Sequence, residues 1–172
     1  MKKITKILTL GILFLFAFTL QLSAQKCKFD YNKTDPITGE ATKGNKFEVN
    51  GSWDMGFNKI GETYYISMEY DTRGELKDIL QVNDPIVIKL SNGEIITLTA
   101  QEECPPSYQM LWAAGWYTYW KGKYSIDASS IKQIAENLPV FARMNIGNKV
   151  YEQQISDKVG KKISQAAACI LQ

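Results

Sequence analysis

The sequence predicts an α+β fold that is mainly antiparallel β, arranged as a sandwich or half-barrel, with a short helix and a C-terminal amphipathic helix. Two observations support this prediction. Strand-forming β-branched and aromatic residues are frequent, and aromatic residues alone make up 12% of the chain. Strand-like segments fill the middle and the strongest helical pattern comes last, an order that argues against alternating βαβ winding.

The first half of the chain contains three strand-like segments and one turn. Residues 26–31 alternate in polarity, as in a half-buried strand. Residues 35–39 read Asp-Pro-Ile-Thr-Gly, which predicts a turn because proline presets φ and glycine accepts positive φ. Residues 46–49 and 63–70 are the next predicted strands, and we expect the second to end at residues 71–74.

The second half contains two predicted hairpins. Residues 85–90 and 94–99 are β-branched runs around Asn92-Gly93, which favours a type I′ turn. A second hairpin is expected over residues 140–155, turning near Gly147-Asn148.

Two helices are predicted after residue 126. Asp127 or Ser129 can cap a short helix through Glu136, before Pro139 stops it. The last helix starts near Ser156-Asp157, whose oxygens can accept its first free N–H groups. Its apolar residues fall on one stripe at helical spacing: Val159, Ile163, Ala166, Ala167 and Ile170.

Residues 1–24 have the pattern of a secretory signal peptide. Three lysines precede an uncharged apolar run, and small residues stand before an expected cut ahead of Gln25. The run is shorter than the roughly 20 residues of a membrane span, so we expect no stable anchor after cleavage; an uncleaved N-terminal anchor is the alternative. Cys27 lies two positions too late for lipid attachment. Residues 25–172 then form a single domain, located in the periplasm or outside the cell.

Removing the leader changes the charge of the protein. The whole chain has 20 basic and 18 acidic residues, a formal charge of +2. Three lysines and no acid lie in the leader, so 17 basic and 18 acidic residues remain, and the mature charge is −1. The mature chain has no concentrated basic stripe, which argues against nucleic acid as a partner.

Three cysteines remain after cleavage: Cys27, Cys104 and Cys169. In an exported protein, an odd number indicates one disulfide and one further thiol. Pairing Cys27 with Cys169 would join both termini, and Cys104 lies in a predicted loop before two prolines. From the residues alone, the pairings Cys27–Cys104 and Cys104–Cys169 stay open.

The chain resembles a group of small exported proteins of unassigned activity from Bacteroidota-type bacteria. The resemblance rests on the leader, residues 27–32 and 35–39, the Asn-Gly hairpin, and the helix ending in Cys-Ile-Leu. It covers most of the mature chain and implies the same β-rich layout. It also favours the pairing of Cys27 with Cys169, and it implies no catalytic residues.

Common catalytic and metal sites lack their residues. The chain has no histidine to activate a serine or cysteine nucleophile, and its cysteines lack zinc-site spacing. We therefore expect no metal and no cofactor. Paired carboxylates remain an alternative route to hydrolysis, if two acids converge in a cleft.

Aromatic residues are concentrated between positions 112 and 120. The candidate ligand-binding residues are Trp112, Trp116, Tyr117, Tyr119 and Trp120. In a strand or a helix, the three tryptophans would share one face. They either fill the core or form an exposed platform for a glycan or peptide. The leading hypothesis is an exported, non-catalytic binding or structural module; an aromatic-lined glycan or peptide binder, a carboxylate-dependent hydrolase and a protein acting through a strand edge are the alternatives.

Overall fold

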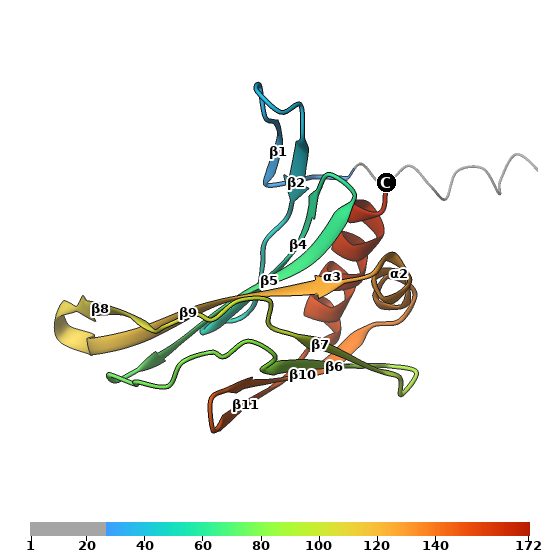
Figure 1. Ribbon diagram of the computed structural model, residues 1–172. Coiled ribbons are helices and arrows are strands. Elements are labelled where there is room, and N and C mark those ends of the chain that lie inside the picture. Colours follow the sequence, from blue (N-terminus) through green and yellow to red (C-terminus); the bar gives the residue numbers. More distant parts are fainter. Residues whose placement is uncertain (1–26) are drawn as a thin grey trace, which may run out of the picture.

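The computed structural model describes residues 27–172, so the predicted signal peptide lies outside the described residues. The α+β prediction is confirmed: two antiparallel sheets carry two helices, one of them C-terminal (Figure 1). The strands are β1 Tyr31–Thr34, β2 Ala41–Gly44, β3 Phe47–Asn50, β4 Trp53–Ile60, β5 Thr63–Arg73, β6 Pro85–Leu90, β7 Ile95–Thr99, β8 Ser107–Leu111, β9 Gly115–Ile126, β10 Pro139–Ile146 and β11 Lys149–Gln154. The helices are η1 Trp112–Ala114, α2 Ala128–Glu136 and α3 Asp157–Ile170.

The larger sheet has seven strands and curls into a half-barrel. Its order is β1-β2-β4-β5-β9-β8, and β3 pairs with the same edge of β4 as β2 does. The two longest strands, β5 and β9, form its centre and pair from Tyr64↔Ile126 to Arg73↔Tyr117. This pairing corrects the predicted end of β5. The polar residues 71–73 stay in the strand because β9 supplies partners for them, and Gly74, at φ +105°, ends it.

The smaller sheet has the order β11-β10-β6-β7 and contains both predicted hairpins. The type I′ prediction for the β6–β7 turn is wrong. Of the turn residues 91–93, only Gly93 has a positive φ, and the Leu90 carbonyl accepts the Gly93 N–H at 3.0 Å. These features define a type I turn followed by a glycine bulge, which needs one residue more than a type I′ turn. The β10–β11 hairpin turns through Gly147-Asn148, as predicted.

The core lies between the inner faces of the two sheets and the helices. On β5 the inward residues are Tyr64, Ile66, Met68 and Tyr70, the row that the sequence predicts. The largest fully buried side chains include Trp53, Phe57, Trp120 and Tyr124. Helix α3 contacts α2, β10, β4 and β3, so it closes one end of the half-barrel (Figure 1).

Both helices begin where the sequence predicts. The Asp127 carboxylate caps α2 by accepting the Ser130 N–H at 2.8 Å, and Ile131 and Ile134 are buried. Helix α3 follows Ser156, but the Ser156 side chain makes no capping hydrogen bond, contrary to expectation. On the predicted α3 stripe, Ile163, Ala167 and Ile170 are fully buried, whereas Val159 and Ala166 are partly buried.

The N-terminal segment differs most from the prediction. Residues 27–30 form no strand, and β1 begins only at Tyr31. Cys27 is bonded to Cys169 at the end of α3, which confirms the pairing that the resemblance favours and leaves Cys104 as the free thiol. The disulfide directs this segment towards α3 and away from a sheet edge. The predicted 35–39 turn is present, with the Asp35 carboxylate accepting the N–H groups of Ile37 and Thr38.

Candidate functional site

The β8–β9 hairpin projects beyond the rest of the half-barrel, at the end of the molecule opposite α2 and α3 (Figure 1). Strand β8 pairs with β9 from Ser107↔Tyr119 to Leu111↔Gly115. It is the last strand in the sheet order, so no strand of residues 27–172 lies beside its second edge, and all five of its residues are exposed. The hairpin therefore presents both its apex and one strand edge to solvent.

The apex separates the three tryptophans. Trp112 lies in the turn η1, at φ +22°, and is 98% exposed. The prediction that all three tryptophans share one strand face is thus wrong for Trp112, because the chain reverses between Leu111 and Gly115. Gly115, at φ +86°, completes the reversal.

The remaining predicted site residues lie along β9, from surface to core. Trp116 is 41% exposed, whereas Trp120, on the same face of the strand, is 1% exposed. Tyr117 and Tyr119 lie on the opposite face and are partly buried. Four strand residues span about 13 Å, so this face of β9 runs from the buried Trp120 to the exposed Trp116 near the apex.

Trp120 belongs to an internal aromatic cluster and not to a binding platform. Its indole N–H donates to the Asp78 carbonyl at 2.8 Å. Its ring stacks on Tyr70, with centroids 6.1 Å apart, and Tyr151 lies against both rings. Trp53 meets Tyr70 edge-on. Of the three tryptophans, only Trp112 and Trp116 therefore remain available to a ligand.

Five large exposed side chains lie on this hairpin, and we call them the hairpin patch: Tyr108, Met110, Leu111, Trp112 and Trp116. Tyr108, Met110 and Trp116 share one face of the hairpin, Leu111 lies on the other face, and Trp112 is at the apex. Sequence reasoning missed Met110 and Leu111, because residues 107–110 alternate like any half-buried strand, and the pattern does not show that both faces of this strand are exposed. Single exposed hydrophobic residues are ordinary, but five of them on one short hairpin indicate an interaction site.

Hydrogen bonds hold the hairpin to the segment after β5. The Tyr108 hydroxyl donates to the Leu76 carbonyl at 2.9 Å, and the Gly74 N–H donates to the Trp116 carbonyl at 2.8 Å. The buried Thr118 hydroxyl donates to the Gly74 carbonyl and accepts the Leu76 N–H. The base of the patch is thus fixed to the body of the protein before any ligand arrives.

The free edge of β8 lacks the usual protection against strand addition. Its sequence, Ser-Tyr-Gln-Met-Leu, contains no charge and no proline, and its pairing with β9 shows no bulge. By contrast, the edge strand β1 contains Lys33, and β11 contains Lys149 and Glu152. Strand β7 is also uncharged, but the chain directly after it is bridged to β9 at Ala100↔Tyr124.

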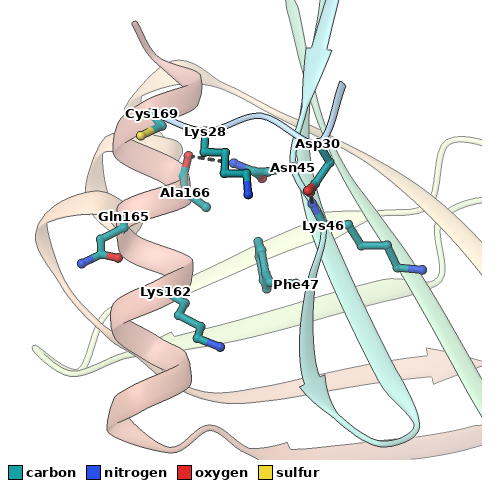
Figure 2. Close-up of a pocket in the computed structure, with 9 residues that line it drawn as sticks. All are labelled: Lys28, Asp30, Asn45, Lys46, Phe47, Lys162, Gln165, Ala166 and Cys169. Atoms are coloured by element: carbon teal, nitrogen blue, oxygen red, sulfur yellow. Dashed lines mark hydrogen bonds between the residues drawn. The ribbon is translucent and has the colours of Figure 1, made fainter. Parts of the chain in front are cut away.

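A cavity of about 560 Å³ lies at the other end of the molecule, between α3 and the chain around β3 (Figure 2). Lys28, Phe47 and Lys162 line it, and the Lys28 and Lys162 ammonium groups approach it from opposite sides. None of these residues is a site candidate from the sequence, because they are far apart in the chain.

A second cavity, of about 440 Å³, lies on the outer face of the half-barrel. Its polar side chains already bind one another. The Tyr31 hydroxyl donates to the Asn58 side chain, whose amide donates to the Ser67 hydroxyl at 3.0 Å. The Lys123 ammonium lies 4.1 Å from the centroid of the Tyr65 ring. Most donors in this cavity are therefore occupied.

Two acids do converge near that cavity, as the hydrolase alternative requires, but a lysine lies between them. The Lys46 ammonium lies 3.1 Å from the Asp54 carboxylate and 2.7 Å from the Glu69 carboxylate. Hydrogen bonding to Lys46 lowers the pKa of Glu69, which keeps it ionised. Burial, with a contribution from Asp54, raises the pKa of Asp71, yet neither Asp54 nor Asp71 lines either cavity. The arrangement is that of an ion-pair network.

Residues 27–172 contain no cluster of three or more metal-ligating His, Cys, Asp or Glu side chains. Within the same part of the chain, no helix combines the length and apolar character that a membrane crossing requires. The free Cys104 is partly buried, and its sulfur accepts the Lys121 N–H at 3.3 Å.

No protein-family model matches the chain, and no significant match to a curated protein or a solved structure was found. The resemblance to exported Bacteroidota-type proteins therefore stays a prediction.

Proposed function

We propose that the protein is an exported, non-catalytic binding module, and that it recognises a protein partner through the β8–β9 hairpin. The partner contributes an extended segment, which adds to the free edge of β8 while the hairpin patch packs against its side chains. The observation that carries this proposal is the combination, on one short hairpin, of an uncharged unpaired edge and a 98% exposed tryptophan.

The chemistry of the patch favours a protein over a glycan. Tryptophan, tyrosine and methionine are enriched in the buried centres of protein interfaces, and tryptophan and tyrosine are frequent hot spots. A glycan site also needs polar groups around its aromatic rings to bind the sugar hydroxyls. The Tyr108 hydroxyl already donates a hydrogen bond to the Leu76 carbonyl, and the other four side chains of the patch offer only two indole N–H groups.

Export is supported by the predicted signal peptide and by the disulfide. Disulfide bonds form and persist in the periplasm and outside the cell, and they are rare in the reducing cytosol. The Cys27–Cys169 bond is compatible with that location.

A non-catalytic role is supported by the residues available. The sequence contains no histidine, and the acids that approach each other are neutralised by Lys46. A carboxylate-dependent hydrolase needs one acid that keeps its proton, whereas Glu69 has a lowered pKa.

Selection from a displayed library of short random peptides tests the proposal. The bait is the immobilised mature chain, residues 25–172. We expect enriched peptides to bind it at least tenfold more weakly after Trp112→Ala, and similarly after Met110→Lys, which places a charge on the free edge. Val150→Ala is the matched control, because Val150 is an exposed hydrophobic residue on the other sheet, and it should leave binding unchanged.

The competing ligands are tested with the same proteins. If a glycan array or anionic vesicles bind the wild-type protein through Trp112 while no peptide is enriched, the proposal is overturned in favour of that ligand. It is also overturned if selected peptides bind the Trp112→Ala and Met110→Lys variants as well as they bind the wild type.

A further inference from the structure

The cavity beside α3 is assembled from three distant parts of the chain. Lys28 follows Cys27, whose disulfide to Cys169 fixes the N-terminal segment against the end of the helix. Phe47 begins β3, and Lys162 lies on α3 (Figure 2). The cavity volume of about 560 Å³ falls within the range of small-molecule sites.

The bend between β2 and β3 forms a fixed wall of this cavity. The buried Asn45 amide donates to the Ala166 carbonyl at 3.5 Å, and its side-chain oxygen accepts the Phe57 N–H at 3.1 Å. Next to it, the Lys46 N–H donates to the Asp30 carboxylate at 2.5 Å. Asn45 thus ties the bend both to α3 and to β4, and Asp30 is held at the cavity's edge.

The charges around the cavity are unbalanced. Within residues 27–172, neither the Lys28 nor the Lys162 ammonium forms a salt bridge, although other surface lysines of this protein do so. Lys46 also lines the cavity, but its side chain extends away from it (Figure 2), and its ammonium pairs with Asp54 and Glu69. Two unpaired cations therefore face one space, and among the described residues that line it Asp30 is the single anion.

An aromatic surface lies between the two cations. The Phe47 ring is half-buried and packs on Phe57, with centroids 5.9 Å apart, which leaves its other side towards the cavity. Figure 2 shows this ring between Lys28 and Lys162. A ligand that occupies the cavity thus meets an apolar surface as well as two positive charges.

We propose that this cavity binds a hydroxylated organic monoanion of the sugar-acid class. The ligand carboxylate lies between the Lys28 and Lys162 ammonium groups, and an apolar C–H face of the ligand ring lies on Phe47. The Asp30 carboxylate accepts a hydrogen bond from a ligand hydroxyl. Asp30 also disfavours polyanions, because a second negative charge would lie near it. The site is separate from the β8–β9 hairpin and independent of the proposed function.

Titration with glucuronate, followed by NMR of the mature chain, tests the proposal. We expect saturable shifts at Lys28, Phe47 and Lys162, with weaker binding at higher salt. Lys28→Gln and Lys162→Gln should each weaken binding about tenfold, the size expected for loss of a charge-assisted hydrogen bond. Lys161→Gln is the matched control, since this neighbouring exposed lysine does not line the cavity, and it should change affinity less than twofold.

Glucose and sulfate separate the parts of the proposal. Glucose lacks the charge and sulfate lacks the ring, so we expect each to bind at least tenfold more weakly than glucuronate. Equal binding of sulfate would show a general anion site, and equal binding of glucose would show that the lysines do not select the ligand; either result overturns the proposal. The absence of saturable shifts with glucuronate also overturns it. None of these outcomes bears on the proposed function of the hairpin, which is tested separately by the effect of Trp112→Ala on peptide binding.

Discussion

Cys27 and Cys169 form a disulfide whose Cα atoms are 5.4 Å apart, although 142 positions separate them in the sequence. The bond joins the described N-terminal segment to the last turn of α3. In the chain-entropy model, a closed loop of this length stabilises the folded state by about 5 kcal/mol, and measured effects are usually about 2–4 kcal/mol.

Replacing both cysteines by serine should therefore lower the free energy of unfolding by about 2–4 kcal/mol. Urea unfolding, followed by circular dichroism, measures this loss. Cys104→Ser is the control, because Cys104 forms no disulfide, and it should cost less than the double replacement. Equal stability of the double variant and the wild type would contradict the account.

Mutations at the two ends of the aromatic segment 112–120 should differ in their effect on the free energy of unfolding. Trp120→Ala removes a fully buried ring and its hydrogen bond to Asp78, so we expect a loss of about 3–5 kcal/mol. Trp112→Ala removes an exposed ring and should change stability by no more than about 0.5 kcal/mol. Thermal unfolding of both variants measures the difference, and a large loss with Trp112→Ala would show that Trp112 supports the fold.

Asp127 should make α2 sensitive to acid. Hydrogen bonds from the Ser129 side chain and the Ser130 backbone lower the pKa of Asp127 to about 2. Because the folded pKa is lowered, the contribution of this carboxylate to stability is present above about pH 4, the value in the unfolded chain, and is lost as the pH falls towards 2. Asp127→Asn keeps a capping oxygen but cannot titrate, so its stability should vary less over this range.

Stability curves of the two proteins between pH 2 and pH 7 test this expectation. Asp127→Ala, which removes the cap, should cost about 1 kcal/mol at pH 7. Identical acid dependence of the wild type and Asp127→Asn would show that the N-cap carboxylate does not contribute.

Gly160 allows α3 to approach β10. A Cβ atom at this position would lie 2.7 Å from the Pro139 carbonyl oxygen, a backbone atom that cannot move alone. In an exposed helix, Gly→Ala stabilises by about 1 kcal/mol, but here we expect the contact to reverse the sign and destabilise by about 1–3 kcal/mol. Gly51→Ala is the control, since a Cβ there meets nothing within 4 Å. We expect Gly160→Ala, but not Gly51→Ala, to lower the melting temperature, and an unchanged value for Gly160→Ala would contradict the prediction.

Local signals in the sequence predicted the elements whose structure depends on near neighbours. The β6–β7 hairpin follows from two β-branched runs around Asn92-Gly93, and α2 follows from Asp127 and its apolar spacing. These local signals did not predict the type of turn. A hairpin with Gly93 accepts either a type I′ turn or a type I turn with a glycine bulge, and the register of the strands decides between them.

Contacts between distant residues explain what the sequence could not predict. Trp112 and Trp120 have the same spacing from Trp116, and only the reversal at Gly115 and the length of β9 place one outside and one in the core. Lys28 and Lys162 face one cavity only because the disulfide and the bend at Asn45 bring their segments together. The Cys27–Cys169 pairing stayed open from the residues alone, because positions in the sequence do not show which thiols meet in the fold.

Amide hydrogen exchange in β8 tests the proposed function most directly. It is measured in the free protein and in the complex with a selected peptide. We predict that the β8 amides facing away from β9 exchange rapidly in the free protein and become protected in the complex, together with a change in the Trp112 indole signal. Protection confined to other strands, with β8 and Trp112 unchanged, would contradict the proposal that this hairpin binds the partner.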